Sequence, residues 1–153
     1  MKYNVPEVGE IEIKNIVLDL NGTLSVHGKI PDGVKERLSS IKKIGIDVVL
    51  FTGDMRKTAK DLCEDLGISF VKCKNSQEKE KAMSKFNPET TAAIGNARID
   101  IGTFKKARVS VATLQAEGIH AGIVKHVDVI VPSINDALDF FIDKNTFSAT
   151  MRK

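Results

Sequence analysis

The sequence Ile16-Val17-Leu18-Asp19-Leu20-Asn21-Gly22-Thr23-Leu24 decides the fold of this chain. Its three leading apolar residues predict a buried strand of a parallel sheet, because both faces of such a strand are covered. Asp19 then stands at the carboxyl end of the strand, where open α/β sheets bind their ligands. Gly22 allows a sharp turn, and Thr23 adds a hydroxyl just beyond it. From this stretch alone, Asp19 is equally compatible with a nucleophile or metal ligand and with a simple cap of the turn.

The bulk properties fit one soluble domain, which we expect to span residues 1–153. The net charge of +3 is spread along the chain, so no basic block predicts a nucleic-acid partner. No apolar run approaches the length of a membrane span, so no membrane association is expected. Cys63 and Cys73 have nine residues between them and form no CxxC pair. They predict free, buried thiols in a reducing, cytoplasmic compartment.

Strands and helices are expected to alternate along the chain. An alternating apolar and acidic segment at 8–13 is typical of a half-buried edge strand, and the polar tail beyond Asp143 is expected to fray. Ser133 is expected to cap the last helix. After the first strand, the pattern predicts strands at 46–51, 68–71, 90–94, 109–112 and 127–131, and helices at 34–44, 55–66, 77–86 and 134–142, with a short helical piece that ends near 107.

This alternation predicts an α/β fold with a doubly wound parallel sheet and helices on both faces. Because crossovers between parallel strands are right-handed, the strand ends fall on one edge of the sheet. Three polar turns from distant parts of the chain would then meet there: Asp19 with Gly22, Thr52 with Gly53, and Gly95 with Asp100. This convergence favours a chemical role for Asp19 over a turn cap.

The same turns resemble the motifs of the haloacid dehalogenase (HAD) superfamily, whose fold is a three-layer Rossmannoid sandwich. Residues 19–24 resemble its first motif, and residues 50–54 resemble its second, a Thr or Ser that ends a hydrophobic strand. Lys81 resembles the lysine of the third motif, with Lys79 and Lys74 as alternatives.

The soluble P-type ATPase-like subgroup is the part of the superfamily that the chain resembles most. Residues 95–100 are similar to the acidic loop of that subgroup. Residues 133–138 also resemble the subgroup, so the likeness spans about residues 16–150. The interval from Leu24 to Ile46 holds only a loop and one helix, so no large cap domain is expected.

The resemblance implies a Mg²⁺-dependent phosphohydrolase in which Asp19 forms an aspartyl phosphate. The Asp19 carboxylate, the backbone carbonyl of Asn21 and Asp100 would hold Mg²⁺. Asn96 stands where an Asp often contacts the metal in the family. These four residues form the predicted metal site.

The phosphorylated substrate would be held by neighbouring groups of the same loops. The Thr52 hydroxyl and the backbone N–H groups around Gly22, Thr23 and Gly53 would bind the phosphoryl oxygens. Lys81 would pair with the charge that develops during transfer.

Three features depart from the family pattern: Asn21, Asn96, and the pair Ala97 and Ile99, which replaces the usual Gly and Asn of the loop. Asn21 replaces the Asp that usually protonates the leaving group and then activates water, and an amide can do neither. Because such acid–base help is worth typically about 10²–10⁴-fold, we expect a slow phosphatase or one that accumulates phosphorylated Asp19. Asn96 is expected to weaken metal binding, and an apolar Ile99 is unusual beside a metal loop.

Two alternatives remain open. A catalytically impaired regulatory or binding module is favoured by Asn21, Asn96 and Ile99. A response-regulator-like receiver also combines an aspartyl phosphate with Mg²⁺, Thr and Lys. Asp19 lies on the first strand and not the third, and Gly-Thr-Leu begins three residues after it, which disfavours this alternative. The sequence predicts neither the substrate's identity nor the oligomeric state.

Overall fold

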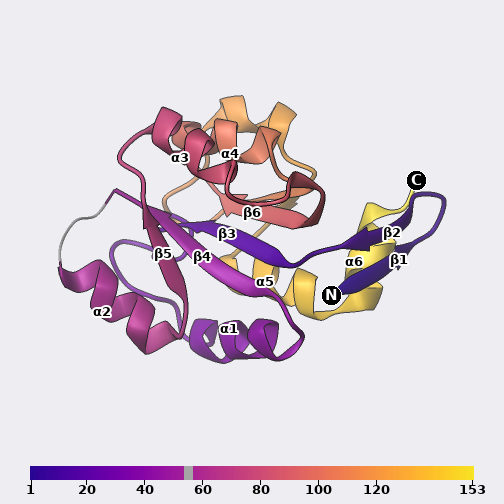
Figure 1. The fold of residues 1–153 in the computed structure, drawn as a ribbon, viewed down its shortest axis with the longest axis horizontal. Coiled ribbons are helices and arrows are strands. Elements are labelled where there is room, and N and C mark those ends of the chain that lie inside the picture. The colour runs from indigo at the N-terminus through magenta and orange to yellow at the C-terminus, as the bar shows by residue number, and fades with distance from the viewer. Residues whose placement is uncertain (54–56) are drawn as a thin grey trace.

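A computed structural model describes residues 1–53 and 57–153, apart from the side chains of residues 57 and 58 (Figure 1). Asp54 of the second motif and the expected helix start at Met55 lie outside the described residues. The strands are β1 (Lys2–Val5), β2 (Gly9–Glu12), β3 (Asn15–Asp19), β4 (Asp47–Thr52), β5 (Ser69–Lys72), β6 (Thr91–Gly95), β7 (Val109–Thr113) and β8 (Val129–Val131). The helices are α1 (Val34–Lys43), α2 (Lys57–Leu66), α3 (Ser76–Met83), α4 (Ile101–Lys105), α5 (Ile134–Ile142) and α6 (Lys144–Met151), with 3₁₀ turns η1 (Pro88–Thr90), η2 (Arg98–Asp100) and η3 (Ala121–His126).

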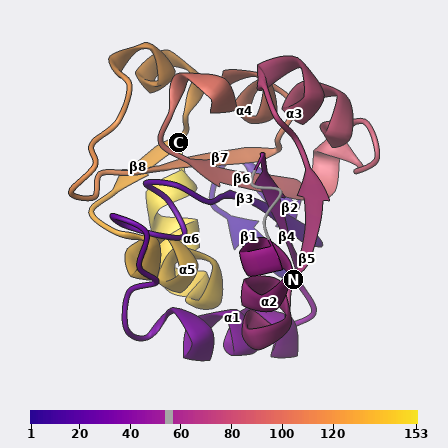
Figure 2. The same ribbon diagram turned by 90° about the vertical axis from the view of Figure 1, so that its left-hand side faces the viewer.

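Six of the strands form a parallel sheet in the order β5-β4-β3-β6-β7-β8. Helices α3 and α4 cover one face, and α1, α2 and α5 cover the other (Figures 1 and 2). The predicted doubly wound, three-layer α/β fold is therefore confirmed. In the described part of the chain, no helix has the length and apolar character that crossing a membrane would require.

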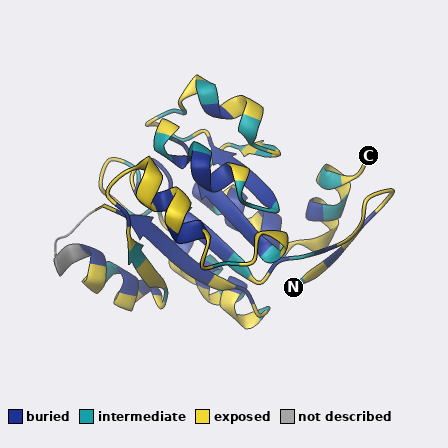
Figure 3. Ribbon diagram, turned by 45° about the horizontal axis from the view of Figure 1, so that its top comes forward, coloured by how far each residue is buried: buried dark blue, intermediate teal, exposed yellow. Residues whose placement is uncertain are grey.

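The continuous apolar run of β3 is explained by the two cores on either side of the sheet. Ile16 and Leu18 pack into the larger core with α1 and α5, while Val17 packs into a second core with Ala82 and Met83 of α3. Figure 3 shows the central strands buried along their length. Each of these three β3 side chains is at most 1 % exposed, which fits a strand covered on both faces.

The chain changes direction across the sheet at β3. The next two strands, β4 and β5, lie on one side of it, while β6, β7 and β8 lie on the other. Ligands of doubly wound sheets bind outside the carboxyl ends of the strands at such a switch point. The fold thus places the end of β3, and Asp19 with it, at the expected position of a site.

The two ends of the chain pack together. Residues 9–12 form β2, which pairs antiparallel with β1 in a separate two-stranded sheet, so the predicted edge strand is present but lies outside the main sheet. The tail beyond Asp143 was expected to fray, but it forms α6, whose first N–H groups are capped by the Asp143 carboxylate. Phe147 of α6 is fully buried and stacks on Tyr3 of β1. The tail is therefore ordered by its packing on β1 and not by its own pattern.

Candidate active site

Asp19 ends β3, and the loop that follows it is closed by its own backbone. The Leu20 carbonyl accepts hydrogen bonds from the N–H groups of Thr23 at 3.3 Å and Ser25 at 2.8 Å, and the Gly22 N–H donates to the Ser25 carbonyl. Gly22 has a φ of +76°, and a Cβ there would lie 2.3 Å from Asn96 Nδ2, so the turn requires glycine. The loop is therefore preformed, and the Gly22 N–H is engaged inside it.

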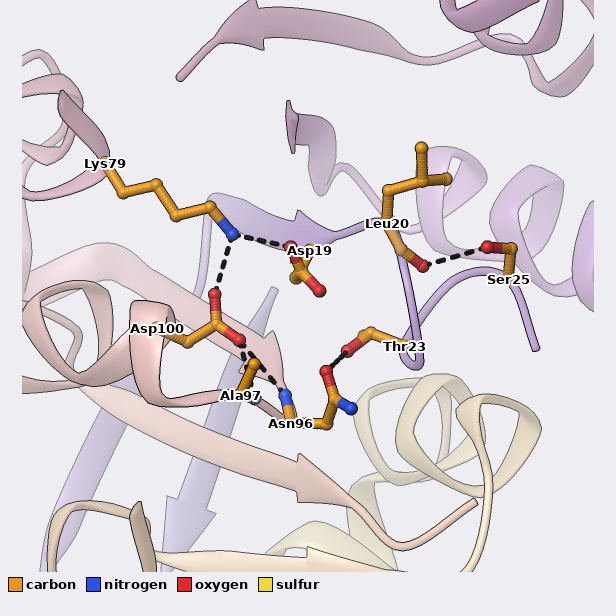
Figure 4. Close-up of polar contacts among 8 residues, drawn as sticks. All are labelled: Asp19, Leu20, Thr23, Ser25, Lys79, Asn96, Ala97 and Asp100. Atoms are coloured by element: carbon orange, nitrogen blue, oxygen red, sulfur yellow. Dashed lines mark hydrogen bonds and ion pairs between the residues drawn. The ribbon is translucent and has the colours of Figure 1, made fainter. Parts of the chain in front are cut away.

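A buried lysine joins two carboxylates at the end of this strand (Figure 4). Lys79 Nζ lies 2.5 Å from Asp19 Oδ1 and 2.7 Å from Asp100 Oδ1. The side chains of Lys79 and Asp100 are 3 % and 4 % exposed, and that of Asp19 is 13 % exposed. Three ionisable groups from β3, α3 and η2 thus meet in one largely water-excluded place.

The loop after β6 holds Asp100 in position. Its Oδ2 accepts hydrogen bonds from the backbone N–H groups of Asn96 at 3.1 Å and Ala97 at 3.0 Å. A Cβ on Gly95 would lie 2.6 Å from the same oxygen, so a glycine is needed for this close approach. One Asp100 oxygen is thereby fixed by the backbone, and the other faces Lys79.

Burial controls the protonation of this cluster. Burial, with a further contribution from the charge of Asp100, raises the pKa of Asp19 to about 6, although Lys79 acts in the opposite direction. Burial alone would lower the pKa of the Lys79 ammonium, but the charges of Asp19 and Asp100 outweigh it and the pKa lies above its usual value. The lysine therefore stays charged, while Asp19 is a carboxylate of raised basicity.

The cluster faces a cavity of about 690 Å³ that is open to solvent. Thr52 and Gly53 from the end of β4 line it together with Asp19 and the exposed Asn21, as predicted for residues that meet at this edge. The full lining is Asp19, Leu20, Asn21, Thr52, Gly53, Cys73, Lys74, Lys79, Ala97 and Ile99. Ile99 is half-buried and forms part of the wall.

The structure corrects the predicted lysine. Lys81 is exposed on α3, whereas Lys79 is buried against the two carboxylates. The helical period explains the difference, because Lys79 shares the inward face with Ala82 and Met83, and Lys81 does not. That signal is present in the sequence, since the apolar Ala82 and Met83 follow Lys79 by three and four residues, which is the spacing of one helical face. Lys74 also lines the cavity, and in the described part of the chain no hydrogen bond or ion pair joins it to Asp19 or Asp100.

The side chains of Thr23 and Asn96 lie outside the cavity lining and support the loop. The Thr23 hydroxyl is fully buried and donates to Asn96 Oδ1 at 3.2 Å (Figure 4), and its N–H donates to the Leu20 carbonyl. Asn96 Nδ2 donates to the Gly118 carbonyl at 3.0 Å. Both ends of the Asn96 amide are thus bonded to the protein, and these bonds would compete with the predicted roles of Asn96 at the metal and Thr23 at the substrate.

The remaining groups suit a magnesium ion. Two carboxylate oxygens, from Asp19 and Asp100, already converge on one cationic nitrogen. Mg²⁺ prefers hard oxygen ligands and uses one or two protein carboxylates with several waters. The described residues place no third His, Cys, Asp or Glu side chain beside these two carboxylates, so backbone oxygens and water would complete the shell of the ion.

Gln115 was missed by sequence reasoning. Its amide contacts the loop after Asp19 from the end of β7, although the residue lies far from any motif in the sequence. No periodic pattern or motif marks it, because its partners are backbone carbonyls, which carry no sequence signal.

The chain is similar to known proteins at two levels. Residues 7–108 match the sequence pattern of the haloacid dehalogenase-like hydrolases. Over 96 residues the chain is 28% identical to the copper-exporting P-type ATPase B of Archaeoglobus fulgidus. That alignment covers 61% of this chain and 14% of the ATPase, so the chain spans a small part of the ATPase's length.

Solved phosphatases share the fold. The cobalt-bound deoxy-D-mannose-octulosonate 8-phosphate phosphatase of Haemophilus influenzae matches with a TM-score of 0.76 at 18% identity, over 92% of this chain and 93% of that one. The 3-deoxy-D-manno-octulosonate 8-phosphate phosphatase of Moraxella catarrhalis, solved with magnesium, phosphate and KDO, matches with a TM-score of 0.71 at 17% identity, over 90% and 91% of the two chains. At these identities the likeness shows the fold alone.

Proposed function

The chain belongs to the haloacid dehalogenase-like hydrolase family, and on that premise we propose that it is a Mg²⁺-dependent phosphohydrolase that acts through an aspartyl phosphate on Asp19. The observation that carries the proposal is the convergence of Asp19 and Asp100 on one buried cation beside an open cavity. A buried cluster of this kind has a high cost in free energy as a purely structural device, which favours a functional role.

The chain's own residues account for the transfer step. The Asp19 carboxylate attacks phosphorus, the new Asp–phosphate bond forms, and the bond to the ester oxygen breaks on the opposite side. Lys79 balances the negative charge that gathers there, and Thr52 with Gly53 holds the phosphoryl oxygens at the cavity wall. Water then cleaves the acyl phosphate and regenerates Asp19.

The donor set fits magnesium, which the Moraxella phosphatase also holds. Asp19 and Asp100 would provide its carboxylate ligands, with the Asn21 carbonyl as a further oxygen ligand. When bound, the ion would neutralise the repulsion between the nucleophile and the phosphate. In the metal-free state Lys79 supplies positive charge to both carboxylates.

Asn21 sets the expected rate. Its side chain is exposed at the cavity, where an acid would reach the leaving oxygen, but an amide cannot donate that proton. The leaving group must then take its proton from water, and the water that cleaves the acyl phosphate is not activated by a side chain there. We therefore infer slow turnover of phosphate monoesters and a persistent phosphorylated Asp19.

The same residue favours a second candidate, a regulatory or binding module of the same fold that does not turn over. Such a module would bind Mg²⁺ and a phosphoryl analogue but release no product. The two candidates therefore differ in turnover and agree in binding.

Turnover of a chromogenic phosphate monoester with Mg²⁺ separates these possibilities. We expect slow hydrolysis by the unaltered protein, at least about a hundredfold faster hydrolysis by Asn21→Asp, and none by Asp19→Asn.

Intact-protein mass after rapid acid quench should show one phosphoryl group on the unaltered protein and none on Asp19→Asn. Turnover that survives in Asp19→Asn would exclude the proposed nucleophile. If neither the unaltered protein nor Asn21→Asp hydrolyses the ester, but Mg²⁺ and beryllofluoride raise the unfolding midpoint of the unaltered protein, the binding module is favoured.

A further inference from the structure

We propose that Gln115 is a positioning residue that fixes the loop after Asp19 to the start of helix α5 and thereby sets the rate of phosphoryl transfer. The effect on rate rests on the proposed phosphohydrolase function, whereas the effect on the loop does not. Gln115 follows β7 and is half-buried, and it lines no part of the cavity beside Asp19.

The amide of Gln115 uses both of its ends. Nε2 donates to the Gly22 carbonyl at 3.1 Å and to the Thr23 carbonyl at 2.7 Å. Oε1 accepts from the backbone N–H of Ile134 at 2.9 Å. One side chain thus connects two successive peptide groups of the loop with the first turn of α5.

These partners determine which way the amide points. Two carbonyl oxygens require a donor at one end, and an N–H requires an acceptor at the other, so an inverted amide would lose all three bonds. A carboxylate of the same shape could keep the bond to Ile134 but would face two carbonyl oxygens without a donor. The position therefore needs glutamine and not merely a side chain of its size.

The loop depends on this contact because its other backbone groups are already engaged. The N–H groups of Gly22, Thr23 and Ser25 all donate within residues 20–25, and the carbonyls of Gly22 and Thr23 point outward. Besides Gln115, the Thr113 hydroxyl reaches the Gly22 carbonyl at 3.4 Å, which is a weak hydrogen bond. Gln115 is therefore the main external anchor of these two peptide groups among the described residues.

The loop in turn is bonded to the nucleophile. The Leu24 N–H donates to the backbone carbonyl of Asp19 at 3.2 Å, so a shift of the loop reaches the residue that carries the attacking carboxylate. Helix α5 is a rigid support, because Ile134, Ala137 and Leu138 are fully buried and Ser133 caps its first turn. A misplacement of about 1 Å at a reacting group costs on the order of 10² in rate.

Hydrogen exchange and steady-state kinetics on Gln115→Glu test the proposal. We expect the amides of residues 22–25 to exchange at least about tenfold faster than in the unaltered protein, because the loop loses two bonds. We expect kcat/KM to fall about 10- to 100-fold, because this ratio reports the transfer of the phosphoryl group to Asp19 even where hydrolysis of the phosphorylated Asp19 limits kcat.

Two control variants separate positioning from charge and from stability. Gln77→Glu makes the same chemical change at an exposed position of α3 and should leave exchange and kcat/KM unchanged. Phe147→Leu trims a fully buried ring of α6 that packs on Tyr3, so it should lower the unfolding midpoint without the change in kcat/KM.

Unchanged loop exchange in Gln115→Glu would overturn the proposal, as would faster exchange with unaltered kcat/KM. A fall in kcat/KM that Phe147→Leu matches at equal loss of stability would also overturn it. If the unaltered protein hydrolyses no ester, the proposed function fails, while the exchange comparison still decides whether Gln115 holds the loop.

Discussion

The two ends of strand β3 are stabilised in opposite ways. Near its beginning the β1–β2 hairpin lies beside α6 (Figure 1), and the rings of Tyr3, Phe140, Phe141 and Phe147 form an aromatic cluster. At its end Lys79 lies between two carboxylates (Figure 4). In the aromatic cluster Tyr3 stacks on Phe147 with ring centroids 3.8 Å apart, and the Tyr3 hydroxyl donates to the Phe141 carbonyl at 2.6 Å. Both ends are buried, but the first end buries apolar surface and the second buries charge.

The aromatic end of β3 contributes mainly to the stability of the fold, whereas the charged end contributes groups that can do chemistry. Burying aromatic surface lowers the free energy of the folded state directly. Burying three charges does so only if their attraction exceeds their loss of hydration, which is an unfavourable balance in many proteins. We therefore expect the charged end of β3 to contribute less to stability than the aromatic end and to supply the reactive groups instead. Substitutions at the two ends should differ in whether they change stability, turnover or both.

Removing the charge of Lys79 should have the largest effect. In Lys79→Met, Asp19 and Asp100 lose their shared cation, so we expect the free energy of unfolding to fall by about 3–5 kcal/mol without metal. Turnover should fall at least about a thousandfold, because charge compensation is lost in the transition state as well. Urea unfolding measures the loss of stability, and ester hydrolysis measures the loss of turnover. Saturating Mg²⁺ should reduce the difference in stability between Lys79→Met and the unaltered protein.

Lys81→Met is the matched control on the same helix. Its side chain is exposed, so stability should change by no more than about 0.5 kcal/mol and turnover should stay the same. A large loss of turnover in Lys81→Met, with Lys79→Met near normal, would restore Lys81 as the lysine of the site.

Truncating Phe147 should affect the other end alone. Phe147→Ala removes a fully buried ring from contact with Tyr3 and Phe140, and we expect it to destabilise the fold by about 3 kcal/mol. Phe147→Leu should recover most of that loss. The kcat of the folded fraction should equal that of the unaltered protein in both variants. A lower kcat at full folding would show that the two ends are coupled through β3.

The contrast between the two ends also explains how far the sequence could be interpreted. The sheet, its apolar strands and the meeting of Asp19, Thr52 and Asp100 follow from periodicity and from the handedness of crossovers, which are local or general rules. The β1–β2 hairpin and α6 do not follow, because Tyr3 and Phe147 stabilise each other from opposite ends of the chain. A single aromatic residue in a polar tail carries no periodic signal of its own.

At the charged end, the residues that the sequence placed correctly were those at strand ends. Lys81 was placed wrongly because a motif position was given more weight than the helical face that Lys79 shares with Ala82. Asn96 was expected at the metal because of its place in the loop, yet its amide bonds to Thr23 and Gly118. A motif identifies which loops meet, but the direction of each side chain depends on neighbours that the motif does not contain.

Replacing Asp19 by asparagine should give a smaller effect on stability than Lys79→Met or Phe147→Ala, and the most distinctive pH dependence. Burial raises the pKa of Asp19 to about 6 in the folded protein, above the value of about 3.9 expected in the unfolded chain. The stability linked to this group is therefore complete below pH 4 and is lost as pH rises through 6. Asparagine does not ionise, so Asp19→Asn should be the more stable protein without metal, and its advantage should grow by about 2 kcal/mol between pH 4.5 and pH 8.

Excess Mg²⁺ should make the unaltered protein more stable than Asp19→Asn. Such a reversal would show that Asp19 lowers stability because of its charge and not because of poor packing. Excess Mg²⁺ at pH 8 should raise the unfolding midpoint of the unaltered protein and have little effect on Asp19→Asn, because the ion binds the carboxylate that burial disfavours. Parallel urea titrations with Mg²⁺ and with EDTA measure both effects. If Asp19→Asn is less stable at every pH, then the attraction of Lys79 outweighs the burial of Asp19, and the charged end of β3 stabilises the fold as the aromatic end does.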